Sequence, residues 1–202
     1  MTLLLGMRPA DHEYKVMGLA AYNSEKYGGY SFAKFKETLY VDGLNFKYKK
    51  QIKDHFFYFK EVLEGQRFDA IAYGVQKFAE ELLTTWIKNG INHTGIGNVI
   101  LSGGVSQNIK ANKCISELEK LDQLFVPPGP GDESISIGAA WLQFIKKGGE
   151  INDIPIHTNA YFGPSFTSLE IESEIQKLDE NYFKYKKVTE AEVARLIADG
   201  EI

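Results

Sequence analysis

Apolar positions recur at three- and four-residue intervals through much of the first half of the chain, which is the spacing of helices that bury one face. The longest such stretch runs from Phe68 to Lys88, and Gly90 predicts its end. Asp11 stands at the start of the first stretch and is a candidate N-cap. Helical patterns of this kind cover residues 11–22, 27–36 and 51–90.

The period of the apolar pattern changes in the second half of the chain. Two short apolar runs, NVILSGG (98–104) and LFVPP (124–128), predict buried strands. Each run passes through a turn rich in glycine or proline into a helical pattern, at residues 108–121 and 134–147. This alternation of strands and helices predicts an α/β fold, in which helices cover a sheet.

A hairpin is predicted within the helical half. In LYVDGLNFKY (39–48), two β-prone runs flank Asp42-Gly43, which is a strong signal for a two-residue turn.

The chain divides by composition into a main domain at 1–150, a linker at 151–164 and a tail at 165–202. The tail is predicted to contain a helix, a strand and a second helix, over residues 165–178, 182–188 and 189–200. Thr189 and Glu192 would form a capping box at the second helix. Because so short a segment cannot close its own core, we expect the tail to be the start of a truncated second domain.

Composition and charge are those of an ordinary globular protein and disfavour nucleic-acid binding. The 202 residues are 44% hydrophobic and 25% charged, as in an ordinary globular protein, and the net charge of -4 gives no support for nucleic acid as a partner. The lysine-rich run at 46–55 is interpreted as a solvated surface. The four histidines are scattered without metal-ligand spacing.

The expected location is the cytoplasm. Cys114 is the single cysteine, lies on an apolar helical face and is predicted to be a buried thiol in a reducing compartment. No apolar run reaches the roughly 18 residues of a membrane helix, and the first residues lack the pattern of a signal peptide.

Two glycine turns are the candidates for chemistry. Gly103 and Gly104 follow a predicted strand and precede a helix, where glycine lets backbone N–H groups approach a phosphate. The alternative is a tight structural turn. Asp132 lies in the second turn and could cap the next helix or bind a cation. Both turns would lie at the carboxyl ends of neighbouring strands, where open α/β sheets bind ligands.

Several stretches together resemble the O-carbamoyltransferases of the nodulation-protein and cephamycin type. The resemblance covers nearly the whole chain, in the order and spacing of that family. The stretches are HEYKVMGLAAYN (12–23), VQKFAEELL (75–83), LSGGVSQNIKANKCI (101–115), FVPPGPGDESISIGAA (125–140) and FGPSFTSLEIE (162–172).

This resemblance implies an actin-like, sugar-kinase-like ATPase domain followed by a smaller domain similar to threonylcarbamoyl-AMP synthase. Such an enzyme forms carbamoyl adenylate from carbamoyl phosphate and ATP. It then transfers the carbamoyl group to a hydroxyl of a sugar or natural-product acceptor, with a divalent metal, iron in particular. The chain would hold the second half of the actin-like domain and the start of the second domain. Without the rest of that polypeptide we expect it to be inactive and to self-associate through its exposed interdomain face.

By the same resemblance, Gly103, Gly104 and Asn108 would line the nucleotide site, with Lys15 and Gly18 near the same cleft. Asp132 would be a metal ligand. Ala21 and Asn23 depart from the Pro and Gly of the family's first motif, and Glu133-Ser134 departs from the Ala-Gly that usually follows its Asp. These departures bear on the choice of acceptor.

Two other classes of function stay open at this point. One is a different actin-like enzyme, a sugar kinase or a tRNA threonylcarbamoyl transferase. The other is a non-catalytic α/β interaction module, in which the glycines are only turns.

Overall fold

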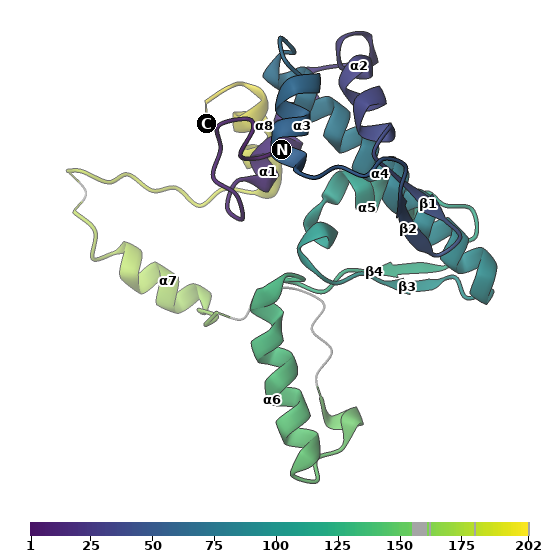
Figure 1. The fold of residues 1–202 in the computed structure, drawn as a ribbon. Coiled ribbons are helices and arrows are strands. Elements are labelled where there is room, and N and C mark those ends of the chain that lie inside the picture. The colour runs from purple at the N-terminus through teal and green to yellow at the C-terminus, as the bar shows by residue number, and fades with distance from the viewer. Residues whose placement is uncertain (155–160, 162, 180, 202) are drawn as a thin grey trace. The chain divides into compact units, whose positions relative to one another are not determined.

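The computed structural model describes residues 1–154, 161, 163–179 and 181–201, and it divides the chain into two compact units, Met1–Ala160 and Tyr161–Ile202 (Figure 1). The helices of the first unit are α1 (Glu13–Leu19), α2 (Glu25–Lys36), α3 (His55–Val62), α4 (Phe68–Thr94), α5 (Ile109–Ser116) and α6 (Ile135–Lys146). Its strands are β1 (Leu39–Asp42), β2 (Asn45–Tyr48), β3 (Asn98–Ile100) and β4 (Gln123–Phe125). Among the helices so described, none combines the length and apolar character needed to cross a membrane.

Helix α4 is the central element of the first unit, because α1, α2 and α5 all pack against it. Its 27 residues continue past Gly90, where the sequence pattern predicted its end. Ile91 explains the difference: it is buried one turn after Ile87 and extends the apolar face of the helix. The helix ends instead at Gly95, which adopts a φ of 70° and donates its N–H to the carbonyl of Ile91 at 2.8 Å.

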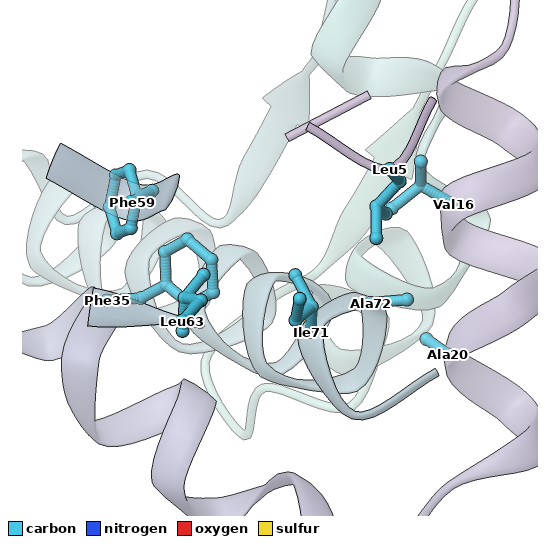
Figure 2. Packing of buried hydrophobic residues seen from close by; sticks show 8 residues of the cluster. All are labelled: Leu5, Val16, Ala20, Phe35, Phe59, Leu63, Ile71 and Ala72. Carbon is cyan, nitrogen blue, oxygen red and sulfur yellow. The ribbon is translucent and has the colours of Figure 1, made fainter. Parts of the chain in front are cut away.

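The larger hydrophobic core gathers residues from the N-terminal segment and from α1, α2, α3 and α4 (Figure 2). Two phenylalanines from different helices, Phe35 and Phe59, pack in a tilted arrangement with ring centroids 4.7 Å apart. The buried members of this core are Leu5, Val16, Ala20, Phe35, Phe59, Leu63, Ile71 and Ala72.

Helices α2 and α4 approach closely at two glycines. A Cβ on Gly74 of α4 would lie 2.6 Å from the backbone nitrogen of Phe32 in α2, and one on Gly28 of α2 would overlap the ring of Tyr73. Only a residue without a side chain fits either position at this helix spacing.

Strands β3 and β4 form a parallel pair in which Val99 lies opposite Leu124, as the strand–helix alternation predicted. The expected burial of these strands is only half correct. Val99 and Leu124 pack on a second cluster built around Ile87, Ile91 and Ile115, whereas the next residue of β3, Ile100, is 73% exposed. Successive strand residues point to opposite faces, and in the described structure only one face of this pair is covered.

The predicted hairpin is present, with a different turn. β1 and β2 are antiparallel and Asp42 pairs with Asn45, so the turn residues are Gly43 and Leu44, with Gly43 at a φ of 61°. Both turn carbonyls are held by α4: Trp86 Nε1 donates to Leu44 at 3.0 Å, and Asn89 Nδ2 donates to Gly43 at 2.8 Å.

Three local predictions need correction. Helix α1 begins after His12 rather than at Asp11, whose carboxylate instead pairs with Arg8 at 2.8 Å. Cys114 is half-buried rather than buried. Asp132 begins a 3₁₀ turn, Asp132–Ser134, and no hydrogen bond from its side chain caps that turn or α6.

The second unit contains α7 (Ser168–Ile175) and α8 (Glu190–Ala198). Both begin with a complete capping box, Thr167 with Glu170 and the predicted Thr189 with Glu192. No strand is present among the described residues of this unit, 182–188 included. A strand forms only where a neighbouring extended segment shares its hydrogen bonds. The predicted linker at 151–164 lies partly outside the described residues.

Candidate functional site

The turn after β3 changes the direction of the chain at Gly103. Gly103 has a φ of 99°, a backbone conformation that residues with a side chain rarely adopt. A 3₁₀ turn, Gly104–Gln107, follows and leads into α5, whose N-cap is Asn108. The side-chain oxygen of Asn108 accepts the N–H of Ala111 at 3.0 Å.

The second glycine turn is bonded to the first. The carbonyl of Pro130 accepts the N–H of Gly103 at 2.7 Å and the hydroxyl of Ser102 at 3.3 Å. Glu133 Oε1 accepts both Gln107 Nε2, at 3.4 Å, and the N–H of Gly131, at 3.1 Å. The two turns therefore meet at the carboxyl ends of the paired strands β3 and β4, as the sequence predicted.

A cavity of about 370 Å³ lies beside the first turn. This volume is within the range of sites that bind small molecules and cofactors. The N-terminal segment, α1, α4 and the 3₁₀ turn before α5 all contribute to its wall. The lining residues are Met1, Thr2, Glu13, Tyr14, Val16, Met17, Val75, Gln76, Ala79, Gly104, Val105, Gln107 and Asn108.

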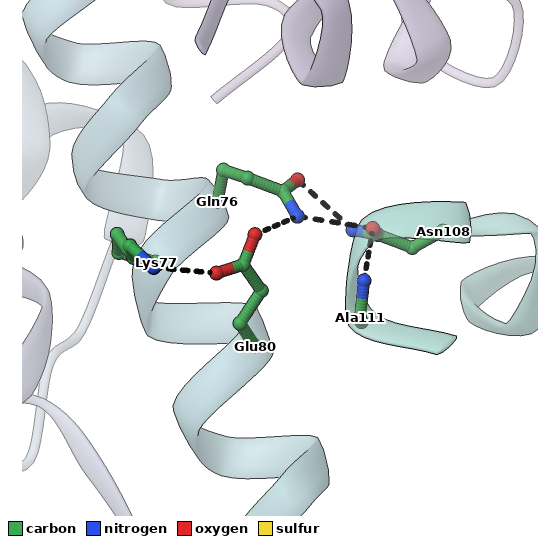
Figure 3. A network of polar contacts seen from close by, with 5 residues as sticks. All are labelled: Gln76, Lys77, Glu80, Asn108 and Ala111. Carbon is green, nitrogen blue, oxygen red and sulfur yellow. Dashed lines mark hydrogen bonds and ion pairs between the residues drawn. The ribbon is translucent and has the colours of Figure 1, made fainter. Parts of the chain in front are cut away.

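Polar groups on the wall of the cavity come from different helices. Glu13 of α1 accepts the N–H of Ala10 at 2.9 Å, and this bond, with one from its own N–H, holds the pKa of the Glu13 carboxyl below its ordinary value. Glu13 is therefore ionised at neutral pH and offers acceptors suited to hydroxyl groups. Gln76 of α4 exchanges two hydrogen bonds with Asn108, each of 3.0 Å (Figure 3).

A family model described as Carbamoyltransferase N-terminus matches residues 1–141 of the chain, which is more than half of its length. The chain belongs to the carbamoyltransferase family. The matched range contains α1, α4 and both glycine turns, and so includes every residue that lines the cavity.

Similar proteins differ in how much of this carbamoyltransferase chain they match. An uncharacterized protein of Methanocaldococcus jannaschii is 28% identical over 100% of the chain and 34% of its own length. Nodulation protein U of Sinorhizobium fredii is 34% identical over 44% of the chain and 16% of its own length. A probable bifunctional tRNA threonylcarbamoyladenosine biosynthesis protein of Methanocaldococcus jannaschii is 35% identical over 39% of the chain and 15% of its own length.

The relatives that match most of the chain are much longer than it is. Three of them are covered over only 34%, 38% and 31% of their length. The carbamoyltransferase chain therefore spans about a third of the length of these curated relatives.

The structure separates the residues that the sequence grouped into one site. Gly104 and Asn108 line the cavity of the carbamoyltransferase chain, whereas Gly103 lies beside it with its N–H bonded to Pro130. Lys15 and Gly18 are on α1, which forms part of the wall, but both are exposed and neither lines the cavity. The Lys15 ammonium lies 5.8 Å from the ring centroid of Tyr14.

Asp132 is exposed and does not line the cavity. Within the described ranges, no group of three or more His, Cys, Asp or Glu side chains could hold a metal ion. One exposed carboxylate does not make a metal centre by itself, so further ligands would be needed beside Asp132.

Gln76 and Glu80 were not predicted from the sequence to belong to a site. Both are only 7% exposed, although they are polar residues on the packed face of α4. Their spacing was a usable signal, because residues four apart on a helix lie on the same face, and this face also carries the apolar residues Leu83 and Ile87.

Proposed function

We propose that the chain is part of an ATP-dependent O-carbamoyltransferase, in which the cavity between α1, α4 and the Gly104 turn holds the nucleotide. The observation that carries this proposal is the family match together with the convergence of Gly104 and Asn108 on one cavity. The ligands of the full reaction would be ATP, carbamoyl phosphate and a hydroxyl-bearing sugar or natural product, with carbamoyl adenylate as the activated species. Neither nucleic acid nor a membrane is a partner in this proposal, and the setting is the cytoplasm.

The chemistry of the cavity wall supports a nucleotide. Gly104 has no side chain and borders the cavity, so a phosphate group can approach the backbone there. The amide of Asn108 provides a hydrogen-bond donor, and the ionised Glu13 can accept from ribose hydroxyls. Apolar residues from α1 and α4, among them Val16 and Val75, supply the surface that a base would contact.

In this proposal the protein acts by binding and orienting the reactants. Nucleotide held at Gly104 and Asn108 would have its phosphate fixed relative to the carbamoyl donor. Fixed N–H dipoles stabilise negative charge that develops on oxygen during acyl transfer. Transfer forms a bond from the acceptor oxygen to the carbamoyl carbon and releases AMP, while the hydroxyl proton is lost to a base.

A divalent metal, iron in particular, is proposed to bind with Asp132 as one of its ligands. When bound, it would supply positive charge near reacting oxygens. Imidazole partners would have to come from outside the described residues, since a lone carboxylate binds such a metal weakly.

The proposed activity belongs to a polypeptide of the length of the relatives, and this chain alone is proposed to be inactive. The reason is that this chain covers only about a third of the length of those relatives. Apolar side chains on β3 and α6, such as Ile100 and Ile135, are exposed and could contact further parts of such a polypeptide. In the chain alone, the same exposed side chains would favour self-association.

A second candidate is transfer of a threonylcarbamoyl group to tRNA. The partial similarity to the tRNA threonylcarbamoyladenosine biosynthesis protein favours it. Binding of tRNA is expected to need a basic surface, and the net charge of -4 disfavours that.

The test is a transfer assay on the full-length polypeptide with ATP, radiolabelled carbamoyl phosphate and a panel of sugar acceptors. We expect label in the acceptor and release of AMP, both dependent on ATP. Incorporation into tRNA with threonine and bicarbonate, and none into any sugar, would favour the second candidate and overturn the first.

A further inference from the structure

Gln76 and Glu80 place an amide and a carboxylate on the packed face of α4, where each residue is only 7% exposed. Burial of such groups costs free energy unless their hydrogen bonds are made. A structural requirement for packing would be met better by apolar residues of similar volume. Packing alone therefore does not explain why these two positions are polar, and the cavity that Gln76 lines suggests a reason.

The hydrogen bonds run in one chain from Lys77 to α5 (Figure 3). Lys77 Nζ lies 3.0 Å from Glu80 Oε2, and Gln76 Nε2 donates to Glu80 Oε1 at 3.0 Å. Gln76 Nε2 also donates to Asn108 Oδ1 at 3.0 Å, and Asn108 Nδ2 donates back to Gln76 Oε1 at 3.0 Å. At the far end, Asn108 Oδ1 accepts the N–H of Ala111 at 3.0 Å.

Both ends of this chain have fixed polarity. The carboxylate of Glu80 accepts from both Gln76 and Lys77, and the backbone N–H of Ala111 can only donate. The amide nitrogen of Gln76 must therefore face Glu80, and the amide oxygen of Asn108 must face Ala111. Neither amide can rotate by 180° without losing bonds at both of its ends.

This orientation decides what the cavity offers to a ligand. Both hydrogens of Gln76 Nε2 and both lone pairs of Asn108 Oδ1 are used within the chain of bonds. Asn108 Nδ2 has one hydrogen that no bond between described residues uses, and Asn108 lines the cavity. The described bonds therefore leave the Asn108 side chain with one N–H to donate and with no free lone pair on its oxygen.

We propose that Gln76 and Glu80 are positioning residues that lock the Asn108 amide with its N–H toward the cavity, and so select ligand oxygens that only accept hydrogen bonds. The phosphate oxygens of a nucleotide have this character. The inference rests on the proposed nucleotide site. It adds that two residues of α4, Gln76 and Glu80, determine whether Asn108 offers the ligand a donor or an acceptor. A reversed Asn108 amide would instead present a carbonyl oxygen, which repels phosphate.

The experiment measures the Kd for ATP by calorimetry on the full-length protein, below the unfolding temperature of each variant. Glu80→Leu removes the acceptor that orients Gln76 and is expected to weaken ATP binding about tenfold, equivalent to the loss of one hydrogen bond. Glu80→Gln keeps an acceptor oxygen and should restore affinity to within about twofold. Glu81→Leu is the matched control, because Glu81 is the next residue of α4 and pairs with Lys36 at 2.7 Å away from the cavity.

Loss of affinity in Glu80→Leu, with normal affinity in Glu80→Gln and Glu81→Leu, is the expected result. A purely structural role would lower the unfolding temperature of Glu80→Leu and leave its Kd unchanged, which would overturn the inference. If Glu80→Leu does not fold, Gln76→Met provides the same test, since it removes the amide while keeping the length of the side chain.

The outcomes also distinguish this inference from the proposed function. Absence of ATP binding by the unaltered protein would overturn the proposed function and the inference with it. ATP binding that is equally strong in the unaltered protein, Glu80→Leu and Gln76→Met would leave the proposed function standing and overturn the inference alone.

Discussion

At the scale of single residues, the two adjacent glycines have different environments. Gly103 adopts a φ of 99°, which shapes the turn. Its N–H donates to the carbonyl of Pro130, which joins this turn to the second glycine turn. Gly104 has no positive φ and borders the cavity. The sequence predicted the pair as a unit, because the pattern of a strand, two glycines and a helix does not say which amide is left for a ligand.

Alanine substitutions should separate these two roles. Gly103→Ala is expected to lower the free energy of unfolding by about 1–2 kcal/mol, because a side chain is disfavoured at that φ although no atom lies within 4 Å of the added Cβ. Gly104→Ala should leave the free energy of unfolding within about 0.5 kcal/mol and weaken nucleotide binding, because its methyl group would stand on the cavity wall. Urea unfolding and ATP titration of both variants test this, and equal stability of the two variants would contradict it.

Asn108 caps α5 and is proposed to bind the nucleotide through the same amide, and the variants Asn108→Asp and Asn108→Ala should separate these two roles. The carboxylate of Asn108→Asp still accepts the N–H of Ala111, so the helix cap is kept, but it can donate neither to Gln76 Oε1 nor to a ligand. We expect Asn108→Asp to weaken ATP binding at least about tenfold, from the lost donor and the added negative charge. Asn108→Ala should in addition lose about 1 kcal/mol of the free energy of unfolding with the cap.

Calorimetry and thermal unfolding of the same samples provide the measurement for Asn108. Undiminished affinity for ATP in Asn108→Asp would show that the donor at this position does not face the ligand.

At the scale of elements, α4 connects the core to the site. One part of its length packs in the larger core through Ile71 and Ala72. A middle part brings Gln76 to the cavity, with Glu80 bonded to it, and the last turns hold the strands β3 and β4 through Ile87 and Ile91. A shift of α4 relative to α2 would therefore move the groups that orient Asn108.

The contact of α2 with α4 is tested by two glycines of the same helix. Gly74→Ala is expected to lower the free energy of unfolding by about 1–3 kcal/mol, because the added Cβ would lie 2.6 Å from the backbone nitrogen of Phe32. Gly90→Ala is the control: it has no atom within 4 Å of its Cβ and should stabilise the helix by up to about 1 kcal/mol. Chemical unfolding followed by circular dichroism measures both, and stabilisation by Gly74→Ala would contradict the close packing.

Elements were predictable from the sequence where local pattern and packing agree. The apolar stripe located α4, and the capping box located α8, because both signals lie within a few neighbouring residues. The end of α4 was misplaced at Gly90, since a glycine inside a helix is tolerated when Ile91 is buried beyond it. The prediction of a strand at 182–188 was wrong because β-prone residues form a strand only beside another strand. The local sequence does not show whether such a neighbouring strand exists.

The site was predictable only in part, for the same physical reason. Gly104 and Asn108 follow a recognisable order of strand, glycine and helix. The link from Asn108 to Gln76 joins residues 32 positions apart, and only the packing of α4 on α5 brings them together.

At the scale of the whole molecule, this member of the carbamoyltransferase family spans about a third of the length of its fuller relatives. One face of the β3–β4 pair is open in the described part of the chain, and Ile100 is 73% exposed there. The proposed transfer reaction therefore belongs to the longer polypeptide, and the nucleotide site is the part of it that we propose for these residues.

The most direct test of the account is a crystal structure of the full-length protein with bound AMP, which carries the phosphate and nucleoside of the proposed adenylate. The account predicts AMP in the cavity between α1, α4 and Gly104, with a phosphate or ring acceptor within about 3.2 Å of Asn108 Nδ2. AMP bound at another site, with this cavity filled by protein side chains, would contradict the assignment of Gly104 and Asn108 to a nucleotide site.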